Sequence, residues 1–336
     1  MPAHRSEVEL ANGAFRLAVK VLGQEIHVRW HSLEAGQDLA QGPYLYRATK
    51  PCPEGTVACE RVLDAAVSAG GDEIRITGRL AGLELRHTFR LLANRPIMEE
   101  RLALYNGGSE VIALLDLITG LRRVIGDTLG RLSPELVEDR LVPIPFPHRP
   151  AREAETDDYF TLARYTTRGG REHRTDTSQE YGYVPSPKHF SEGWAWTHGE
   201  HTLGVFKFNQ EAIEFSVLAV EAGESGLGLC FGGASMLAGD PSCLGHIAPG
   251  QTIELGVTRY VTVRGGYNQA SYAFRAFLDE HGCRFPEGFD PPVHWDEIYD
   301  NAEWYLGSPG HQPGGRSTRR LTYTRALLLQ EAAKAR

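Results

Sequence analysis

The chain has 336 residues, of which 41% are hydrophobic and 23% are charged, an ordinary composition for a soluble globular protein. Its formal net charge of −8 at pH 7 argues against a partner with a phosphate backbone, so nucleic-acid binding is not expected. The sequence holds no run of about 18 apolar residues, so a membrane-spanning helix is not expected either.

The N-terminal residues, MPAHRSEVEL, lack the apolar stretch of a signal peptide and lead directly into an alternating pattern. The five cysteines form an odd set at unrelated spacings, which fits neither a disulfide framework nor a zinc site. Reduced thiols in a cytoplasmic protein are therefore expected.

From position 7 to about position 263, apolar residues alternate with polar residues, which is the period of half-buried β-strands. Turns are predicted at Asn12-Gly13, and the clearest hairpin is centred on Gly82. A further hairpin is predicted to turn at Gly199-Glu200. Because no helical stretch interrupts these strands, the pattern favours a large antiparallel β-sandwich.

The segment from Ile125 to Gln179 breaks this alternation. Four prolines fall within the eight residues Pro143–Pro150, a density that excludes a helix or a central strand. The residues that follow are polar and weakly patterned. The sequence therefore predicts a long loop, and long loops in large β-domains often carry function.

At position 267 the period changes from strand to helix. Tyr272, Ala273, Ala276 and Phe277 fall on one face of the predicted helix, and Gly282 is placed as its C-cap. A linker follows. Residues 290–336 then contain a short strand-like run, a loop rich in glycine and proline, and a helical stretch.

Strand, loop and helix form the repeating unit of a βα-barrel, and one such unit cannot close a barrel. The sequence thus predicts three parts: a β-supersandwich over 1–266, a linker helix and linker over 267–289, and the first βα unit of an incomplete (β/α)8 barrel over 290–336. The apolar face around Leu328 would lie uncovered, which predicts a homo-oligomer or a missing barrel portion packed on it.

Four stretches carry a family resemblance. YAFRAFLDEHGCRF and DPPVHWDEIYDN resemble the junction between the sandwich and the barrel in α-galactosidase-type glycoside hydrolases of family 36. RPIMEERLALYNGG and APGQTIELGVTRYVTV resemble recurrent pieces of the supersandwich in carbohydrate enzymes. The resemblance implies a galactose-mutarotase-like β-supersandwich that leads into a catalytic TIM barrel.

The resemblance also implies a retaining mechanism with two aspartates on later strands of the barrel. On this layout those aspartates would lie beyond Arg336, so no catalytic residue is assigned within the chain. The implied partner is a carbohydrate, an α-galactoside-like sugar, and no cofactor or metal is expected.

The substrate-binding candidates lie at the end of the predicted barrel strand. Trp295, Asp296 and Glu297 would stand at its C-terminal end, where barrel sites form, and Asp300 and Trp304 lie in the following loop. A carboxylate can accept hydrogen bonds from sugar hydroxyls while an aromatic ring stacks on the sugar. Neighbouring strand residues point to opposite faces, so Asp296 and Glu297 are not expected to form a catalytic pair.

Two other functions stay open. An aldose-epimerase-like sugar isomerase uses the same supersandwich and needs a histidine acid and a glutamate base that face each other across one sheet. His87 is the nearest candidate for the acid, although it lies among core-like strands. The other alternative is a non-catalytic carbohydrate-binding or assembly module.

Two further pairs of residues invite a functional interpretation. His198 and His201 fit a hairpin turn better than a metal site, because no third ligand has a suitable spacing. Trp194 and Trp196 share one face of a strand, and core packing is favoured over a carbohydrate platform.

Overall fold

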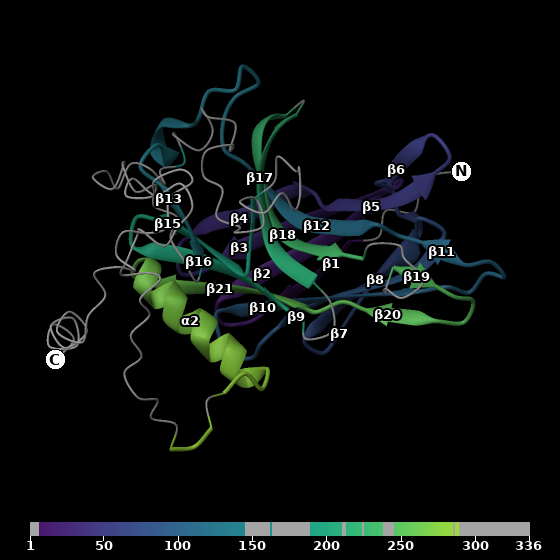
Figure 1. The fold of residues 1–336 in the computed structure, drawn as a ribbon. Helices are drawn as coiled ribbons and strands as arrows, with labels where there is room; N and C mark the ends of the chain where they lie inside the picture. Colours follow the sequence, from purple (N-terminus) through teal and green to yellow (C-terminus); the bar gives the residue numbers. More distant parts are fainter. Residues whose placement is uncertain are drawn as a thin grey trace, which may run out of the picture. The chain divides into compact units, whose positions relative to one another are not determined.

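The computed structural model describes residues 7–144, 162, 189–209, 213–223, 225–237, 245–284 and 286–288. The chain divides into two compact units, Met1–Cys283 and Arg284–Arg336. The first unit is built mainly from antiparallel sheets (Figure 1). The mainly β fold with an antiparallel sandwich, predicted from the alternating pattern, is confirmed. The predicted βα unit over 290–336 lies outside the described residues.

Three sheets make up most of the first unit. The four-stranded sheet has the order β1-β2-β3-β4, with β1 (Glu7–Ala11), β2 (Phe15–Leu22), β3 (Glu25–Ser32) and β4 (Gln37–Pro43). The six-stranded sheet has the order β14-β17-β18-β12-β5-β6, with β14 (His189–Ser191), β17 (Ile213–Gly223), β18 (Gly226–Met236), β12 (Asp116–Val124), β5 (Leu45–Cys52) and β6 (Gly55–Cys59).

The nine-stranded sheet is the largest. It has the order β13-β15-β16-β21-β10-β9-β8-β7, and β20 pairs with β10. Its strands are β13 (Arg140–Ile144), β15 (Gly193–His198), β16 (His201–Phe208), β21 (Val257–Arg264), β10 (Ile97–Tyr105), β9 (Leu83–Leu91), β8 (Glu73–Leu80), β7 (Leu63–Gly70) and β20 (Thr252–Glu254). The remaining elements are β11 (Ile112–Ala113), which pairs with β19 (His246–Ile247), the 3-10 helix η1 (Pro134–Leu136) and the helix α2 (Tyr267–Glu280).

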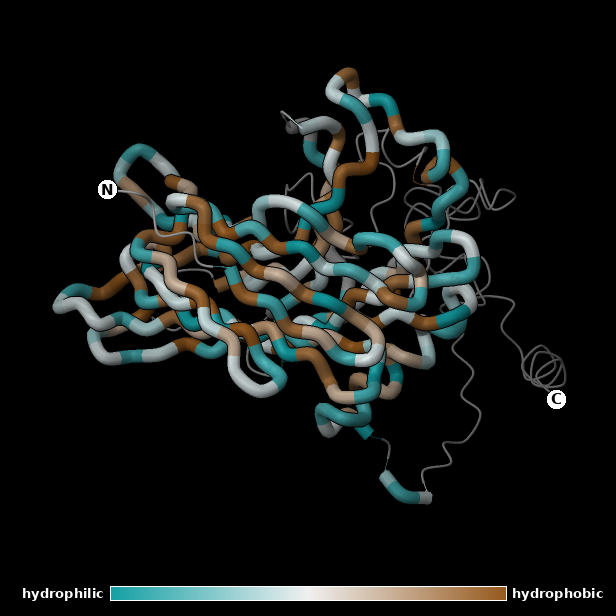
Figure 2. Tube along the Cα trace, turned by 180° about the vertical axis from the view of Figure 1, so that it is seen from behind, coloured by the Kyte–Doolittle hydropathy of each residue, from teal (hydrophilic) through white to brown (hydrophobic). Residues whose placement is uncertain are grey.

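One core joins the inner faces of the three sheets. On β2, Phe15, Leu17 and Val19 are buried and the residues between them are not, and brown and teal alternate along the strands in Figure 2. Trp30 of β3 contacts Phe15 edge to face, with 5.0 Å between ring centroids, and reaches Tyr260 of β21 at 5.7 Å. The four-stranded sheet therefore packs on the nine-stranded sheet through buried aromatic rings.

The turns predicted from the sequence form where expected. Ala81 and Gly82 join β8 to β9 with φ of 55° and 91°, and a two-residue hairpin turn of this kind needs positive φ at both positions. Between β1 and β2, Oδ1 of Asn12 accepts a hydrogen bond from the backbone N–H of Phe15 at 2.8 Å. Gly199, with φ of 57°, turns the chain between β15 and β16.

The prediction of a loop from Ile125 to Gln179 is wrong near its start, where η1 and β13 form. β13 includes Pro143, yet it lies at the edge of the nine-stranded sheet and pairs with β15 alone. An edge strand can accommodate a proline, because one side of the strand needs no ladder hydrogen bonds.

The predicted helix is α2, and Gly282 follows its end with φ of 86°. The buried face differs from the prediction. It consists of Ala270, Phe274 and Phe277, whereas Tyr272 is 70% exposed. Two phenylalanines at this spacing bury more apolar surface than the face that contains Tyr272, so they decide the orientation of the helix. Within the described part of the chain, no helix is long and apolar enough to span a membrane.

α2 covers the outer face of the nine-stranded sheet over β16 and β21 (Figure 1). Phe206 of β16 meets Phe274 and Phe277 at 5.4 Å and 5.9 Å between ring centroids. Together with Ile97 and Val261, these rings form a second apolar core.

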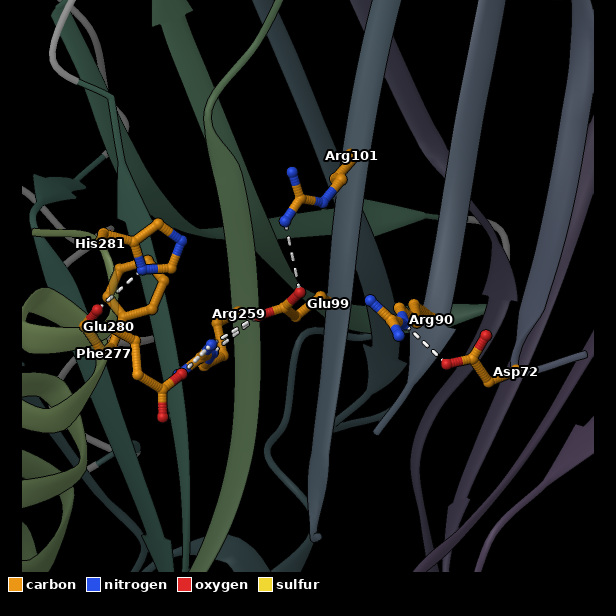
Figure 3. A network of polar contacts seen from close by, with 8 residues as sticks. All are labelled: Asp72, Arg90, Glu99, Arg101, Arg259, Phe277, Glu280 and His281. Carbon is orange, nitrogen blue, oxygen red and sulfur yellow. Dashed lines mark hydrogen bonds and ion pairs between the residues drawn. The ribbon is translucent and has the colours of Figure 1, made fainter. Parts of the chain in front are cut away.

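An ionic network with two buried members, Arg259 and Glu99, lies beside this second core (Figure 3). The Nη2 atom of Arg259 on β21 lies 2.5 Å from Oε1 of Glu99 on β10 and 2.6 Å from Oε2 of Glu280 on α2. The guanidinium carbon of Arg259 lies 4.8 Å from the ring centroid of Phe277. Arg259 therefore links the helix to two strands of the sheet through charge and through a cation–π contact.

Candidate functional site

A cleft of about 700 Å³ is lined by β3 and β4 of the four-stranded sheet and by β12, β17 and β18 of the six-stranded sheet. β4 also packs against β12. We name this hollow the Arg122 cleft. Its charged and amide side chains are His27, Asp38, Gln41, Arg122, Arg123 and Glu221.

An ion pair crosses the six-stranded side of the cleft. The Nη2 atom of Arg122 on β12 lies 3.2 Å from Oε2 of Glu221 on β17. β18 separates these two strands, and Gly228 stands opposite Glu221 in the register. Arg122 stands opposite Cys230, so the two long side chains reach each other diagonally across β18. The cleft thus presents a donor and an acceptor side by side.

Asp38 supplies a carboxylate from the other sheet. Its oxygens lie 3.0 Å from Nε of Arg29 and 2.8 Å from Nδ1 of His31. Arg29 and His31 are two positions apart on β3, so strand alternation places both on the same face as their partner. The carboxylate of Asp38 is thereby fixed in orientation at the edge of the cleft.

Arg123 is held differently from Arg122. Its Nη2 atom donates to Oε1 of Gln37 at 3.2 Å, and its guanidinium carbon lies 4.8 Å from the ring centroid of Trp196. No ion pair joins Arg123 to a carboxylate among the described residues. Burial lowers the pKa of Arg123, while more distant carboxylates, Asp139 foremost, act in the opposite direction.

Arg123 also lines a second, smaller pocket together with His198 and His201. There, Asp139 accepts a hydrogen bond from Nε1 of Trp196 at 2.7 Å, and its other oxygen lies 2.6 Å from Nδ1 of His198. Burial raises the pKa of Asp139, although the hydrogen bonds from His198 and Trp196 act to lower it. The buried carboxylate therefore fixes the orientation of the His198 ring.

The interpretation of these side chains from the sequence is largely confirmed. His198 and His201 flank the turn between β15 and β16, as predicted. Trp194 and Trp196 are both buried in the core. Among the described residues, no group of three or more His, Cys, Asp or Glu side chains is arranged to hold a metal ion.

A buried polar cluster lies apart from the cleft. The Nε2 atom of His87 lies 2.9 Å from Oε1 of Glu100, and both side chains are fully buried. Tyr44 and Tyr260 donate hydrogen bonds to Glu100, and the hydroxyl of Tyr46 lies 2.5 Å from Nδ1 of His87. His87 therefore belongs to the core, and it does not fit the exposed acid that an epimerase needs.

Burial shifts the pKa values of this pair in opposite directions. It lowers the pKa of His87 to about 3. It raises the pKa of Glu100 to about 7, although the hydrogen bond from Tyr260 and the charge of Lys207 act to lower it. Both shifts favour the neutral forms, which a buried environment prefers.

The substrate-binding residues predicted from the sequence, Trp295, Asp296, Glu297, Asp300 and Trp304, lie outside the described residues. Their role stays a prediction. The Arg122 cleft, in contrast, was not predicted. The signal for this cleft in the sequence was the pair of consecutive arginines, Arg122 and Arg123, near the end of an apolar strand. The ion-pair partner of Arg122, Glu221, lies on a strand far away along the chain.

No protein-family model matches the sequence, and no curated protein matches it. Several solved structures have a similar arrangement. The galactose mutarotase related enzyme of Lactobacillus acidophilus gives a TM-score of 0.49 at 12% identity, covering 77% of this chain and 98% of that chain. A galactose mutarotase-like protein from Lactobacillus casei gives 0.46 at 11% identity, covering 77% and 100%.

An α-galactosidase of family 36 from Geobacillus stearothermophilus, solved with 1-deoxygalactonojirimycin, gives a TM-score of 0.42 at 9% identity. That match covers 80% of this chain and 42% of that chain, so the aligned region is less than half of the α-galactosidase. At these identities, the likeness concerns the arrangement of the strands.

Proposed function

We propose that this chain binds a carbohydrate in the Arg122 cleft. The observation that carries the proposal is the polar lining of the cleft, in which the Arg122–Glu221 pair comes from one sheet and Asp38 and Gln41 come from another. Sugar hydroxyls both donate and accept hydrogen bonds, so a wall of alternating donors and acceptors suits them. A volume of about 700 Å³ is in the range of sites for small ligands.

We further propose that the chain is the sandwich portion of an α-galactosidase-like glycoside hydrolase. The resemblance of residues 290–301 to the start of a barrel in that family supports this proposal. Trp295, Asp296 and Glu297 would then contact substrate, and hydrolysis would need barrel carboxylates that are not assigned in this chain.

Isothermal titration calorimetry with galactose, glucose and methyl α-galactoside tests binding. We expect measurable heat with at least one of these sugars, and a loss of about tenfold or more in affinity for Arg122→Ala, because a charge-assisted hydrogen bond is removed. Arg79→Ala is the matched control, since Arg79 lies on β8 and pairs with Asp64 away from the cleft. Equal affinities for the wild type and Arg122→Ala would contradict the assignment of the cleft.

A sugar isomerase is the second candidate, and the composition of the cleft favours it. His27 lines the cleft together with the carboxylates of Asp38 and Glu221, so an acid and a base of the required types share one hollow. Polarimetry of freshly dissolved α-D-glucose and α-D-galactose tests this function. Faster mutarotation that His27→Gln abolishes would support an isomerase, whereas binding without any acceleration would support a binding module.

A further inference from the structure

We infer that the carbohydrate bound in the Arg122 cleft is an oligosaccharide, and that its second sugar unit lies in a neighbouring hollow on the outer face of the four-stranded sheet. This inference rests on the proposed function, because it specifies the class of carbohydrate for the same cleft. The hollow has a volume of about 430 Å³. We name it the Ala18 hollow.

The first argument is the way in which the sheet forms the hollow. On the outer face, Ala18 of β2 stands in one cross-strand row with Glu9 of β1 and Arg29 of β3. Arg16 and Lys20 flank it along its own strand, because alternate residues of a strand share a face. A methyl group among four long polar side chains leaves open space above it. Ala18 is therefore the floor of the hollow.

The second argument is that the hollow and the Arg122 cleft share a rim. His27 of β3 lines both spaces, as do Gln41 and Gly42 of β4. A Cβ atom at Gly42 would meet no atom within 4 Å, so the space beside the rim is open. Gln41 stands in the same row as Ala18, two strands away, which puts the two residues about 10 Å apart. One pyranose ring cannot span that distance, whereas a chain of two or more sugar units can.

The third argument is the chemistry of the lining. Apart from two histidines, the charged side chains that line the hollow are three cations and two carboxylates: Arg16, Lys20, Arg29, Glu7 and Glu9. Asp38 supplies the third carboxylate, 3.0 Å from Arg29, so the charges balance. Balanced donors and acceptors suit the hydroxyl groups of a neutral sugar. The amide of Gln41 at the shared rim both donates and accepts, so it can bind a hydroxyl group of either sugar unit.

The experiment measures how affinity depends on the length of the sugar. Isothermal titration calorimetry compares methyl α-galactoside with melibiose, and methyl α-glucoside with maltose, so that each disaccharide has a matched single sugar. We expect at least one disaccharide to bind about tenfold or more tightly than its single sugar, because the second unit adds contacts in the hollow.

Filling the hollow shows whether the second unit lies there. Ala18→Leu places a larger side chain on the floor, so the affinity for the disaccharide should fall to that for the single sugar. The affinity for the single sugar should not change, because Ala18 does not line the Arg122 cleft. Glu9→Ala removes a wall of the hollow without adding bulk, and it should reduce the same preference.

The matched control is Ala11→Leu. Ala11 lies on the same outer face of the four-stranded sheet, but it does not line the hollow. This variant should keep the preference for the disaccharide. Thermal unfolding of each variant shows that the fold is retained.

Each outcome has a clear meaning. A preference for the disaccharide that Ala18→Leu removes and Ala11→Leu keeps supports the inference. Equal binding of single sugars and disaccharides overturns it while the proposed function stands. A preference that Ala18→Leu leaves unchanged overturns the place of the second unit, and a loss of single-sugar affinity in that variant overturns the place of the first. The absence of binding to every sugar overturns the proposed function and this inference together.

Discussion

His87 and Glu100 lie against each other in the core, with 2.9 Å between Nε2 of the histidine and Oε1 of the glutamate, and neither side chain is exposed. The two residues are diagonal neighbours on β9 and β10, where His87 stands opposite Leu102 and Glu100 stands opposite Phe89, and both side chains are directed into the core. A histidine and a glutamate buried side by side give the stability of the fold a specific dependence on pH.

The pH dependence follows from the two pKa shifts. Because the pKa of His87 falls from 6.5 to about 3, the unfolded chain binds more protons at this site between these values, and stability rises with pH. Because the pKa of Glu100 rises from 4.5 to about 7, the folded chain binds more protons there, and stability falls between these values. The two effects oppose each other where the ranges overlap.

Comparing each single variant with the wild type isolates the contribution of the residue that was removed. Relative to the wild type, Glu100→Gln should gain stability as the pH rises from about 5 to 7, with a slope of about 1.4 kcal/mol per pH unit at most. Relative to the wild type, His87→Gln should lose stability with rising pH between about 3 and 6. Urea unfolding at a series of pH values measures both differences, and a pair of pH-independent differences would contradict the predicted shifts.

Arg259 should be far more important for stability than an exposed arginine on the same strand. Arg259→Ala would leave the buried Glu99 without its strongest ion-pair partner, and such a loss costs about 3–5 kcal/mol. Arg264→Ala is the matched control on β21, because Arg264 and its partner Glu200 are both exposed. Chemical denaturation should show a large loss for the first variant and almost none for the second. Similar losses would mean that the ionic network in Figure 3 does not anchor the helix.

Asp139→Asn should destabilise the region around the small pocket. The carboxylate accepts hydrogen bonds from two ring N–H groups, of Trp196 and His198, whereas one end of the asparagine amide is a donor. The amide NH2 group would then either face a ring N–H or require the His198 tautomer that is protonated on Nε2, at a cost of about 1–3 kcal/mol. Tryptophan fluorescence during urea unfolding reports the change. Asp64→Asn, at an exposed carboxylate whose partner Arg79 is also exposed, is the control and should behave like the wild type.

Gly232→Ala should be poorly tolerated, although Gly228→Ala on the same strand should be nearly neutral. A Cβ atom at Gly232 would lie 2.2 Å from the carbonyl oxygen of Thr119 on the neighbouring strand, and backbone cannot easily move away. At Gly228 the nearest atom would be 3.6 Å away, which is ordinary contact. We expect a loss of about 1–3 kcal/mol or more for the first variant, measured by thermal unfolding. Equal melting temperatures would contradict the close approach of β12 and β18.

The parts of the fold that depend on neighbouring residues could be predicted from the sequence. The hairpin at Gly82 and the helix that ends before Gly282 follow from local periodicity and turn chemistry. The strand at Pro143 was missed, because whether a proline is tolerated depends on the place of the strand in the sheet. The orientation of α2 was also missed, because it is decided by the surface against which the helix packs.

The candidate site was beyond prediction for a related reason. Arg122 and Glu221 are 99 positions apart, and the strand order that brings them together depends on contacts across the whole unit. Asp139 and His198 are 59 positions apart and meet in the same way. Neither the amino-acid composition nor the spacing of residues in the sequence indicates which distant residues will pair. The residues that the sequence did suggest, from Trp295 to Trp304, lie outside the described residues.

The helix α2 also determines how the protein can be divided. A fragment that ended at Gly266 would retain every strand of the three sheets, yet it would lose Phe274, Phe277 and Glu280. Phe206 would then face water, and Arg259 would lose one of its two carboxylates. The smallest piece worth expressing on its own therefore extends through Cys283, where the first compact unit ends.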